Sequence, residues 1–523
     1  MEQFGSAGEH GSHIDGDAAK YLVDGYLPTI GIECHVQLST KTKLFSSVDN
    51  DAREAAPNSK VSAVDYALPG MLPYLNREAI TFAARAGKAL NSQIANVSRF
   101  DRKHYFYPDL PKGYQISQMY QPIILGGHVD LPTGETVRIH HAHLEEDAGK
   151  LTHFSDYSLV DLNRAGTPLI EIVGEPDIHS AAMARAYAEE LHALMTFAGV
   201  TFGDLYYGNM RFDVNISVAK PGAKLGIRTE IKNLNSFRAV EKASEYEIAR
   251  QIELLNSGEK VVQETRGWLD AAGKTVSQRS KEDAQDYRYM PDADIPPVVL
   301  TDAEIAKMQE NMPMLPPEYR KKWRKLDLDK SVINTILQNV QLAGVLDAIF
   351  AEGFPRSKAE IVAGMSELWG GDKISLPDYD KLVKRIFNWF ASIPWENLDM
   401  ARLDGRIGPR WLLSLSKLTE DGKLSSTGAK DVFIAGFAEE WRPEQMPEDI
   451  ARAKNLLQVS DTDAIAKIVD EVLASENCAK AVADFRNGEE KVIGFLVGQV
   501  MKASKGQANP ALAQKLIREK LAQ

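Results

Sequence analysis

Three short runs of the sequence alternate apolar and polar residues, the pattern of strands that have one buried face and one open face. They are Ile30–Leu38 (IGIECHVQL), Arg211–Val218 (RFDVNISV) and Gly226–Asn233 (GIRTEIKN). Successive side chains of a strand point to opposite faces of a sheet, so the apolar residues of each run can pack on a core. The pattern predicts half-buried strands of an antiparallel sheet.

The open faces of these runs carry charged residues, where ordinary half-buried strands carry Thr, Ser or Lys. The polar set comprises Glu33, His35 and Gln37 in the first run, Arg211, Asp213 and Asn215 in the second, and Arg228, Glu230 and Lys232 in the third. The link AKPGAKL between the second and third runs suits a hairpin. A solvated face with cross-strand ion pairs explains one such strand, but three of them favour a functional site.

A further concentration of negative charge is the run His143–Lys150 (HLEEDAGK). Mg²⁺ takes carboxylate oxygens and water as ligands, and commonly substrate phosphates as well. Carboxylates clustered without a cation repel one another, which raises their pKa values. Basic neighbours can hold phosphate oxygens, so the residues alone indicate metal-dependent phosphoryl transfer on one face of the sheet. His143 is a candidate ligand, and a solvated acidic loop is the alternative interpretation of the run.

The composition does not favour indiscriminate nucleic-acid binding, because the formal net charge is -12. RNA contacts would therefore depend on local basic patches. The C-terminal patch in residues 500–523 contains Lys502, Lys505, Lys515, Arg518 and Lys520 against one acid, Glu519. The segment 319–326 (YRKKWRKL) is a second basic patch. A solvated helix face is the alternative interpretation of either one.

Several other classes of site are not supported. The sequence has no G-x-x-x-x-G-K-[ST] loop and no strand-linked G-x-G-x-x-G, so neither a Walker nor a Rossmann nucleotide site is indicated. Cys34 and Cys478 are the only cysteines, which argues for a reducing compartment and against a disulfide scaffold or a cysteine-based zinc site. Cys34 shares the apolar parity of its run and is predicted to be a packed thiol.

The change of sequence pattern along the chain predicts an α+β domain followed by helical domains. Residues 1–25 are polar and Gly-rich and are interpreted as a disordered leader, without the layout of a secretory signal. Short β-type runs dominate residues 26–298, helical periodicity dominates 299–453, and a break in the pattern sets off a tail at 454–523. No apolar run of about 18 residues is present that could span a bilayer, and a cytoplasmic protein is expected.

Eight stretches match, in the same order, motifs of one known family. They are IGIECHVQL, RKHYFYPDLPKGYQISQ (102–118), HLEEDAGK, DLNRAGTPLIEIV (161–173), EIKNLNSFRAVEKA (230–243), QETRGW (263–268), DYRYMPDADIPP (286–297) and GFLVGQVMKASKGQANP (494–510). With them the chain resembles, from residue 26 onward, the B subunits of bacterial aspartyl/glutamyl-tRNA(Asn/Gln) amidotransferases. One match would be weak, whereas this many in order is specific.

The resemblance implies a fold and a reaction. The first domain would be an antiparallel-sheet cradle related to the glutamine synthetase and guanido kinase fold, followed by an all-helical domain and a small helical tail domain that docks tRNA. An amidase A subunit and a small C subunit would complete a heterotrimer. With ATP and Mg²⁺, the B subunit would phosphorylate the side-chain carboxylate of Glu-tRNA(Gln) or Asp-tRNA(Asn), and ammonia from the A subunit would then form the amide. The activity implied is an ATP-dependent carbon–nitrogen ligase with glutamine as amido donor.

The same resemblance implies roles for individual residues. Metal ligands are expected at Glu33, His35, Glu145, Glu146, Asp213 and Glu230, of which Glu146, Asp213 and Glu230 are also expected to be catalytic. ATP phosphate and substrate contacts are expected at Lys150, Arg164, Arg228, Lys232, Arg279 and Arg288. Each of these cations has the alternative role of an ion-pair partner for the acids.

One departure from the family concerns a structural zinc. Some members carry two cysteine pairs shortly after the first strand, whereas this chain has Ser46, Ser62 and Asp65 in that region. A structural zinc is therefore not expected, and ordinary packing is expected to hold the region.

Two other functions stay open on the residues alone. A stand-alone phosphotransferase acting on a small metabolite would turn over ATP without RNA or a partner subunit. A tRNA-binding scaffold with an inert cradle would bind tRNA without consuming ATP, and its tRNA affinity would survive Glu146→Gln and Asp213→Asn.

Overall fold

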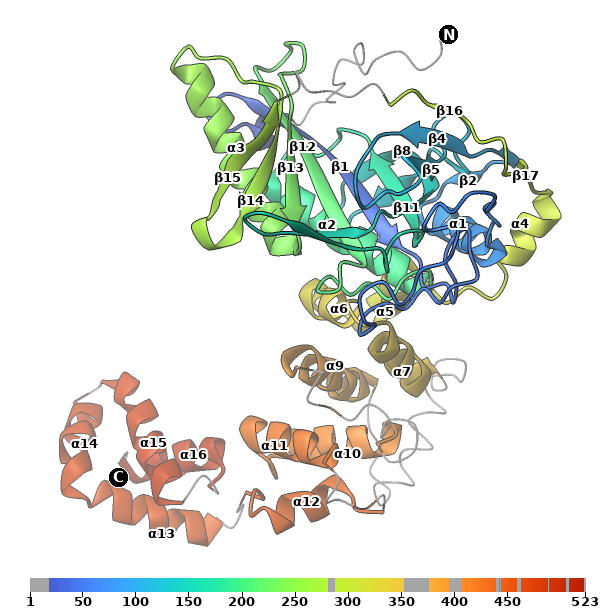
Figure 1. The fold of residues 1–523 in the computed structure, drawn as a ribbon. Helices are drawn as coiled ribbons and strands as arrows, with labels where there is room; N and C mark the ends of the chain where they lie inside the picture. Colours follow the sequence, from blue (N-terminus) through green and yellow to red (C-terminus); the bar gives the residue numbers. More distant parts are fainter. Residues whose placement is uncertain are drawn as a thin grey trace. The chain divides into compact units, whose positions relative to one another are not determined.

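The computed structural model describes residues 18–280, 287–351, 376–394, 398, 407–438, 442, 444–458, 462–487, 489–504 and 508–521. Two compact units make up the chain, Met1–Tyr319 and Arg320–Gln523. The first is a mixed α/β unit built on one large sheet, and the second is helical in its described part (Figure 1). Among the described residues, no helix combines the length and apolar character that crossing a membrane requires.

The large sheet has ten strands, in the order β15-β14-β13-β12-β1-β11-β8-β6-β2, with β7 paired to β8. Their bounds are β1 (Leu27–Gln37), β2 (Gln93–Ile94), β6 (Ile124–Leu125), β7 (His128–Asp130), β8 (Thr136–Glu146), β11 (Pro168–Gly174), β12 (Met210–Ala219), β13 (Thr229–Leu234), β14 (Glu264–Leu269) and β15 (Lys274–Ser280). Every pairing in this sheet is antiparallel except that of β13 with β14. The predicted sheet is confirmed as antiparallel in its main part, with one parallel step.

The alternating pattern accounts for the single apolar face of the sheet. In β1 the side chains of Ile30, Ile32, Cys34 and Val36 are buried, and those of Glu33 and His35 are half-buried on the other face. Phe212, Val214 and Ile216 repeat the pattern in β12. These apolar residues share one core with residues of α1 (Arg77–Ala89), α2 (Ala181–Phe197) and α3 (Phe237–Asn256). The prediction that Cys34 is a packed thiol is confirmed.

Smaller elements complete the first unit. Three small sheets pair β4 (Asp101–His104) with β5 (Tyr114–Ser117) and β16 (Met290–Pro291), β9 (Lys150–His153) with β10 (Ser158–Asp161), and β3 (Val97–Ser98) with β17 (Val298–Val299). Helix α4 (Asp302–Met308) follows β17 and packs against α1, and Arg85 donates a hydrogen bond to the carbonyl of Met308 at 3.2 Å. The first unit therefore continues past residue 298, and the boundary near 298 stays a prediction.

The described part of the second unit consists of helices. They are α6 (Lys330–Ile336), α7 (Val340–Ala351), α9 (Leu376–Ser392), α10 (Pro409–Glu420), α11 (Ser426–Gly436), α12 (Pro447–Ala453), α13 (Thr462–Leu473), α14 (Ala479–Arg486), α15 (Ile493–Ala503) and α16 (Pro510–Leu521), while α5 (Pro316–Trp323) spans the division between the units. The last four share a core of their own that includes Ile465, Leu496 and Ile517. The boundary near 453 stays a prediction.

Two sequence predictions differ in detail from the structure. The third alternating run becomes a strand only at Thr229, so Ile227 is 49% exposed in the preceding turn instead of packing on the core. A Cβ at Gly226 would lie 2.3 Å from the carbonyl oxygen of Val218, so a larger residue would need the backbone to shift here. Residues 1–17 of the predicted leader lie outside the described residues, and Ala18–Tyr21 form a short 3-10 helix.

Candidate active site

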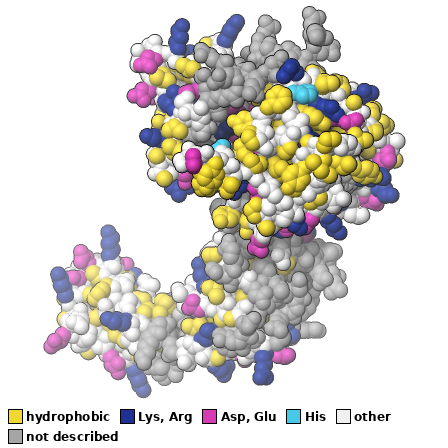
Figure 2. Space-filling model, in the orientation of Figure 1, with side chains coloured by type: hydrophobic (Ala, Val, Ile, Leu, Met, Phe, Trp, Pro, Cys, Tyr) yellow, Lys and Arg dark blue, Asp and Glu magenta, His cyan; other side chains and the backbone are white. Residues whose placement is uncertain are grey.

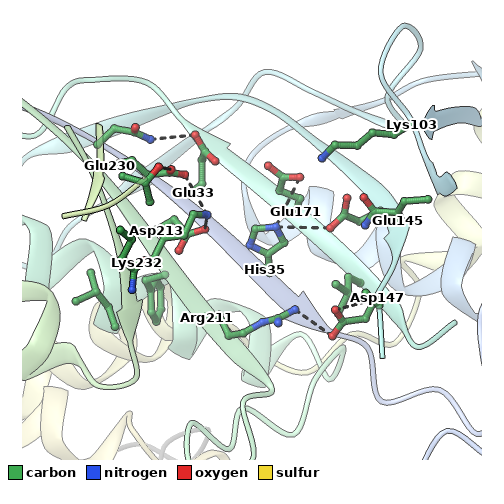
Figure 3. Close-up of a pocket in the computed structure, with 18 of the residues that line it drawn as sticks. Glu33, His35, Lys103, Glu145, Asp147, Glu171, Arg211, Asp213, Glu230 and Lys232 are labelled. Atoms are coloured by element: carbon green, nitrogen blue, oxygen red, sulfur yellow. Dashed lines mark hydrogen bonds and ion pairs between the residues drawn. The ribbon is translucent and has the colours of Figure 1, made fainter. Parts of the chain in front are cut away.

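A cavity of about 940 Å³ lies on the charged face of the large sheet, within the first unit (Figure 3). Strands β1, β8, β11, β12 and β13 supply most of its charged lining, and β4, β14 and β15 contribute further residues. Its ionisable lining residues are Glu33, His35, Lys103, Tyr105, Glu145, Asp147, Glu171, Arg211, Asp213, Arg228, Glu230, Lys232, Glu264 and Tyr287. The charges that strand alternation placed on one face are thus neighbours in space.

His35, Glu145 and Glu171 form a group of side chains that could hold a metal ion. Their ligand atoms all lie within 4.8 Å of one another. Nε2 of His35 is 3.5 Å from Oε1 of Glu145 and 3.8 Å from Oε2 of Glu171. The strand order β1-β11-β8 puts Glu171 between the other two. An imidazole nitrogen and two carboxylates are donors that suit a divalent cation.

A β-bulge at His140 sets which face of β8 carries Glu145. Ile139 pairs with Gly174 of β11 while His141 pairs with Val173, so β8 contains one extra residue, His140. The residues that face the core are Val137 and Ile139 before the bulge and Ala142 and Leu144 after it. A bulge turns the side chains beyond it to the opposite face. This shift brings Glu145 into the cavity.

Glu146 follows Glu145 directly and therefore points to the other face of β8. Its side chain forms an ion pair with Lys112, and its Oε1 accepts a hydrogen bond from the backbone N–H of Ile116 at 2.9 Å. Burial raises the pKa of Glu146, and this effect outweighs the lowering by Lys112. Glu146 does not line the cavity, so the structure does not bring it together with the other predicted ligands.

A second acidic group lies beside the first, formed by Glu33, Asp213 and Glu230. Glu33 of β1 faces Asp213 of β12 across the strand pair, and Nδ2 of Asn215 donates to Oε1 of Glu33 at 3.0 Å. Burial raises the pKa of Glu33, and repulsion from the neighbouring acids, Glu171 first among them, raises it further. A bound cation relieves such repulsion, so this donor set fits Mg²⁺.

Lys232 holds this second group together. Its Nζ lies 2.8 Å from Oδ2 of Asp213 and 3.0 Å from Oε1 of Glu230. Burial alone would lower the pKa of Lys232, but the two carboxylates outweigh it and raise the pKa. Thr265 of β14 donates a hydrogen bond to Oε2 of Glu230 at 2.8 Å, so each oxygen of that carboxylate has a partner. The lysine is thus charged and placed at the cavity surface.

Two further cations line the cavity on other sides. Nη2 of Arg211 lies 3.0 Å from Oδ2 of Asp147, and the Asp147 charge raises the pKa of Arg211. Nζ of Lys103 lies 4.8 Å from the ring centroid of Tyr287. Burial would lower the pKa of Lys103, but Glu145 and other nearby groups raise it above its usual value. Both side chains can meet phosphate oxygens in the cavity.

The predicted phosphate contacts divide into two sets. Arg228 and Lys232 line the cavity, whereas Lys150, Arg164 and Arg288 do not. Nε of Arg164 lies 3.2 Å from Oδ2 of Asp147, and its Nη2 donates to the carbonyl of Gly149 at 2.9 Å. It therefore has the alternative role of an ion-pair partner. Arg279 lies on β15 opposite Thr265, and its side chain is outside the described part of the structure.

Glu171 and Lys103 are among the cavity residues that sequence reasoning missed. Glu171 is a carboxylate between Ile170 and Ile172, so the signal that identified Glu33 was present in β11 as well. Lys103 lies in the matched stretch 102–118, but its strand has four residues and gives no readable alternation. Its position in the cavity depends on how β4 pairs with β5 and β16.

His143 lies behind the group of His35, Glu145 and Glu171. Its Nε2 is 3.2 Å from Oε2 of Glu171 and 3.8 Å from Oε2 of Glu145. Burial alone would lower the pKa of His143, but the two carboxylates raise it to about 10. Burial also opposes ionisation of Glu171, yet His143 outweighs it and holds the pKa of Glu171 well below its usual range.

The region without zinc-binding cysteines contains a buried ion pair. Lys43 is 0% exposed, and its Nζ lies 3.2 Å from Oδ2 of Asp65 and 2.6 Å from the carbonyl oxygen of Ala165. The backbone N–H of Ser62 donates to the same carboxylate at 2.8 Å. The Lys43–Asp65 pair joins two parts of the segment between β1 and α1, and the bond from Lys43 to Ala165 ties that segment to the turn before β11, in addition to the ordinary packing that was expected.

The C-terminal basic patch is largely paired within its own unit. Nη2 of Arg518 lies 3.2 Å from Oε2 of Glu490, Lys520 pairs with Asp470, and Nζ of Lys515 lies 3.9 Å from Oε1 of Glu519. Lys and Arg side chains are interspersed with Asp and Glu on the face of α13–α16 shown in Figure 2. Lys505 lies outside the described residues. In the patch at 319–326, Trp323 and Leu326 are buried and Nζ of Lys322 lies 2.6 Å from Oδ2 of Asp347.

The family models and the most similar curated proteins indicate the same family. Residues 28–306 match the GatB/GatE catalytic domain, and residues 379–521 match the GatB domain. The chain is 45% identical over 505 residues to the B subunit of the aspartyl/glutamyl-tRNA(Asn/Gln) amidotransferase of Alcanivorax borkumensis, covering 94% of this chain and 98% of that protein. The B subunits of the same amidotransferase from Polynucleobacter asymbioticus and Thermotoga petrophila are 44% and 41% identical, over 94% and 95% of this chain and 99% of each relative.

Proposed function

Because the chain belongs to the family of aspartyl/glutamyl-tRNA(Asn/Gln) amidotransferase B subunits, we propose that it activates misacylated tRNA for amidation. Its substrates are Glu-tRNA(Gln) or Asp-tRNA(Asn), and its cosubstrate is ATP. The observation that carries the proposal is that acids suited to Mg²⁺ meet cations suited to phosphate in one cavity, Lys103, Arg211 and Lys232 among them.

The chemistry explains why such a cavity is needed. A side-chain carboxylate is a poor electrophile for ammonia because its oxygen is a poor leaving group. Transfer of the γ-phosphoryl group of ATP to that oxygen gives an acyl phosphate and ADP. Ammonia then attacks the carbonyl carbon, phosphate leaves, and the side-chain amide forms. The first step concentrates negative charge, which the cavity must offset.

His35, Glu145 and Glu171 would hold one Mg²⁺, and Glu33, Asp213 and Glu230 supply further carboxylate oxygens beside it. When bound, the cation neutralises charge on the phosphate oxygens of ATP. Glu171 is added to the ligands predicted from the sequence. Glu146 is left out of the metal-binding set because its carboxylate is held by Lys112 and the Ile116 N–H on the other face.

Cations around the acids would position the phosphates. Arg228 and Lys232, for which the resemblance implies phosphate contacts, line the cavity together with Lys103 and Arg211. Lys232 already contacts Asp213 and Glu230, so it would exchange part of that contact for a phosphate oxygen when ATP binds. This exchange couples nucleotide binding to the arrangement of the acidic group.

The fold and the partners follow the same family. We propose that the first unit is a cradle of the glutamine synthetase and guanido kinase type, and that residues 454–523 dock tRNA. An amidase A subunit would supply ammonia and a small C subunit would complete the heterotrimer. The A subunit must deliver ammonia to the cavity, because the acyl phosphate forms there.

The test is ATP hydrolysis by the chain reconstituted with its A and C partners, with and without Glu-tRNA(Gln). We expect hydrolysis to rise with misacylated tRNA and to stay low with correctly charged or uncharged tRNA. Hydrolysis that ignores tRNA would favour a phosphotransferase acting on a small metabolite. No hydrolysis under any condition, with tRNA binding intact, would favour a scaffold.

A further inference from the structure

His143 contacts the two carboxylates that lie near His35, those of Glu145 and Glu171. It lies on β8 directly opposite Glu171 of β11, on the same face as Glu145. Its Nε2 reaches both of them, at 3.2 Å to Oε2 of Glu171 and 3.8 Å to Oε2 of Glu145. The other oxygen of Glu145, Oε1, lies 3.5 Å from Nε2 of His35. Glu145 thus has one imidazole nitrogen near each of its two oxygens.

The geometry points to His143 as a positioning residue of the metal site and not as one of its ligands. This inference rests on the metal site proposed above. Outer residues that hydrogen-bond to metal-ligating carboxylates set the direction of their free lone pairs. Through its contacts at 3.2 Å with Oε2 of Glu171 and 3.8 Å with Oε2 of Glu145, His143 favours the orientation in which the remaining lone pairs of both carboxylates face the space in front of His35.

Two observations separate positioning from ligation. The ligand atoms that lie within 4.8 Å of one another belong to His35, Glu145 and Glu171, and His143 is not in that group. The His143 side chain is 9% exposed, and its ring stacks on His141 with ring centroids 5.3 Å apart and planes 18° apart, which restricts its orientation.

Nδ1 of His143 is buried and has no hydrogen-bond partner among the described residues. A buried nitrogen without a partner is costly, so the Nδ1 side of the ring gives no reason for a histidine at this position. The contact of Nε2 with the carboxylates is what the histidine adds.

The test uses a matched pair of variants in the complex with the A and C subunits. His143→Gln places an amide N–H near the position of Nε2, whereas the shorter side chain of His143→Asn reaches only the position of Nδ1. His128→Gln is the control, because His128 lies on the neighbouring strand β7, is partly exposed and does not line the cavity. Mn²⁺ is the probe, and its dissociation constant is measured by electron paramagnetic resonance of the free ion.

We expect His143→Asn to weaken Mn²⁺ binding roughly 10–100-fold, the range found when an outer-shell partner is lost. His143→Gln should recover most of that loss, and His128→Gln should match the wild type. If His143→Asn does not assemble with its partners, His143→Leu, which buries no unpaired amide, takes its place. Equal Mn²⁺ affinity in the wild type and the Asn or Leu variant would overturn the positioning role.

Electron spin echo spectra of the bound Mn²⁺ distinguish the remaining outcomes. A directly coordinated imidazole nitrogen modulates the echo, and we expect the modulation from one imidazole in both the wild type and His143→Gln. Loss of modulation in His143→Gln would make His143 a ligand and overturn the inference while keeping the metal site. A wild-type complex that binds no Mn²⁺ would instead remove the metal site proposed above.

Discussion

Glu145 and Glu146 are consecutive residues whose carboxylates serve opposite faces of the same strand. Glu145 lies 3.5 Å from His35 in the cavity, whereas Glu146 is buried against Lys112 on the other side. Of the three acids in the family motif HLEEDAGK, Glu145 and Asp147 therefore line the cavity, and Glu146 lies in the interior of the first unit. A pair of adjacent acids in a strand cannot hold one cation between them, because their side chains diverge.

This divergence predicts different results for two equivalent substitutions. Glu145→Gln should weaken Mn²⁺ binding by at least roughly 100-fold, because the loss of an outer-shell contact alone costs 10–100-fold. Glu146→Gln should leave the Mn²⁺ dissociation constant within about threefold of the wild type, since its carboxylate does not enter the cavity. Binding of Mn²⁺, followed by electron paramagnetic resonance, separates the two. Equal losses in both variants would contradict the assignment of Glu146 to the interior.

Glu171 should behave as a metal ligand although the sequence did not single it out. Glu171→Gln should raise the Mg²⁺ concentration needed for half-maximal ATP hydrolysis by roughly 100-fold or more, since a direct ligand is lost. Glu175→Gln is the matched control, because Glu175 follows the same strand but does not line the cavity. An unchanged Mg²⁺ requirement in Glu171→Gln would exclude Glu171 from the site.

Lys232 should affect nucleotide binding more than it affects folding. Lys232→Met removes a cation from the proposed phosphate path and leaves Asp213 and Glu230 to repel ATP. We expect KM for ATP to rise roughly tenfold or more, in line with about 1.4 kcal/mol for each factor of ten. Lys242→Met, on α3 and paired with exposed Glu245, is the control. The result that would contradict this role is an unaltered KM for ATP in steady-state hydrolysis.

Glu33 links the stability of the first unit to pH and to metal. Its pKa is raised above the usual value of 4.5, so the folded state binds the proton more tightly than the unfolded state. The corresponding stability is fully present below pH 4.5 and is lost as pH rises through the raised pKa. At neutral pH without metal, Glu33→Gln should therefore raise Tm, by roughly 2–4 °C for each kcal/mol of repulsion removed. Mg²⁺ should stabilise the wild type more than the variant in thermal scans, and a lower Tm for Glu33→Gln in metal-free buffer would contradict the sign.

The Lys43–Asp65 pair should matter for stability only when one partner is lost. Lys43→Met leaves a buried, unpaired carboxylate at Asp65, which typically costs about 3–5 kcal/mol. The double variant Lys43→Met/Asp65→Leu removes both charges and should recover most of that loss. Chemical unfolding of the two variants measures the difference. If the double variant were as unstable as Lys43→Met, the ion pair would not be the source of the effect.

Strand alternation predicted much of the site. The alternation of apolar and polar residues within each run assigned four residues to one face, and these residues do share a cavity. They are Glu33, His35, Asp213 and Glu230. The choice between Glu145 and Glu146 could not be made in this way. It depends on the bulge at His140, which is defined by pairing with β11 and interrupts the alternation, so that the core-facing residues change from Val137 and Ile139 to Ala142 and Leu144.

The cations were harder to predict than the acids. A long side chain such as Lys150 or Arg164 can reach several sites from one backbone position, and only tertiary packing decides among them. Arg164 turns to Asp147 and to the backbone near it. Lys103 enters the cavity from a short strand of a different sheet, which no local periodicity could reveal. The acids were predictable because they lie in long strands of the main sheet.

The bulge at His140 also determines which face of the sheet each later residue of β8 occupies. Because strand side chains repeat every two residues, deleting His140 would exchange the surroundings of Glu145 and Glu146, presenting Glu146 to the cavity and turning Glu145 to the interior. Insertion of one further residue would cause the same exchange, and insertion of two would restore the original phase. Between Ile139 and Glu145, length variation in relatives that keep this site should therefore be even in number.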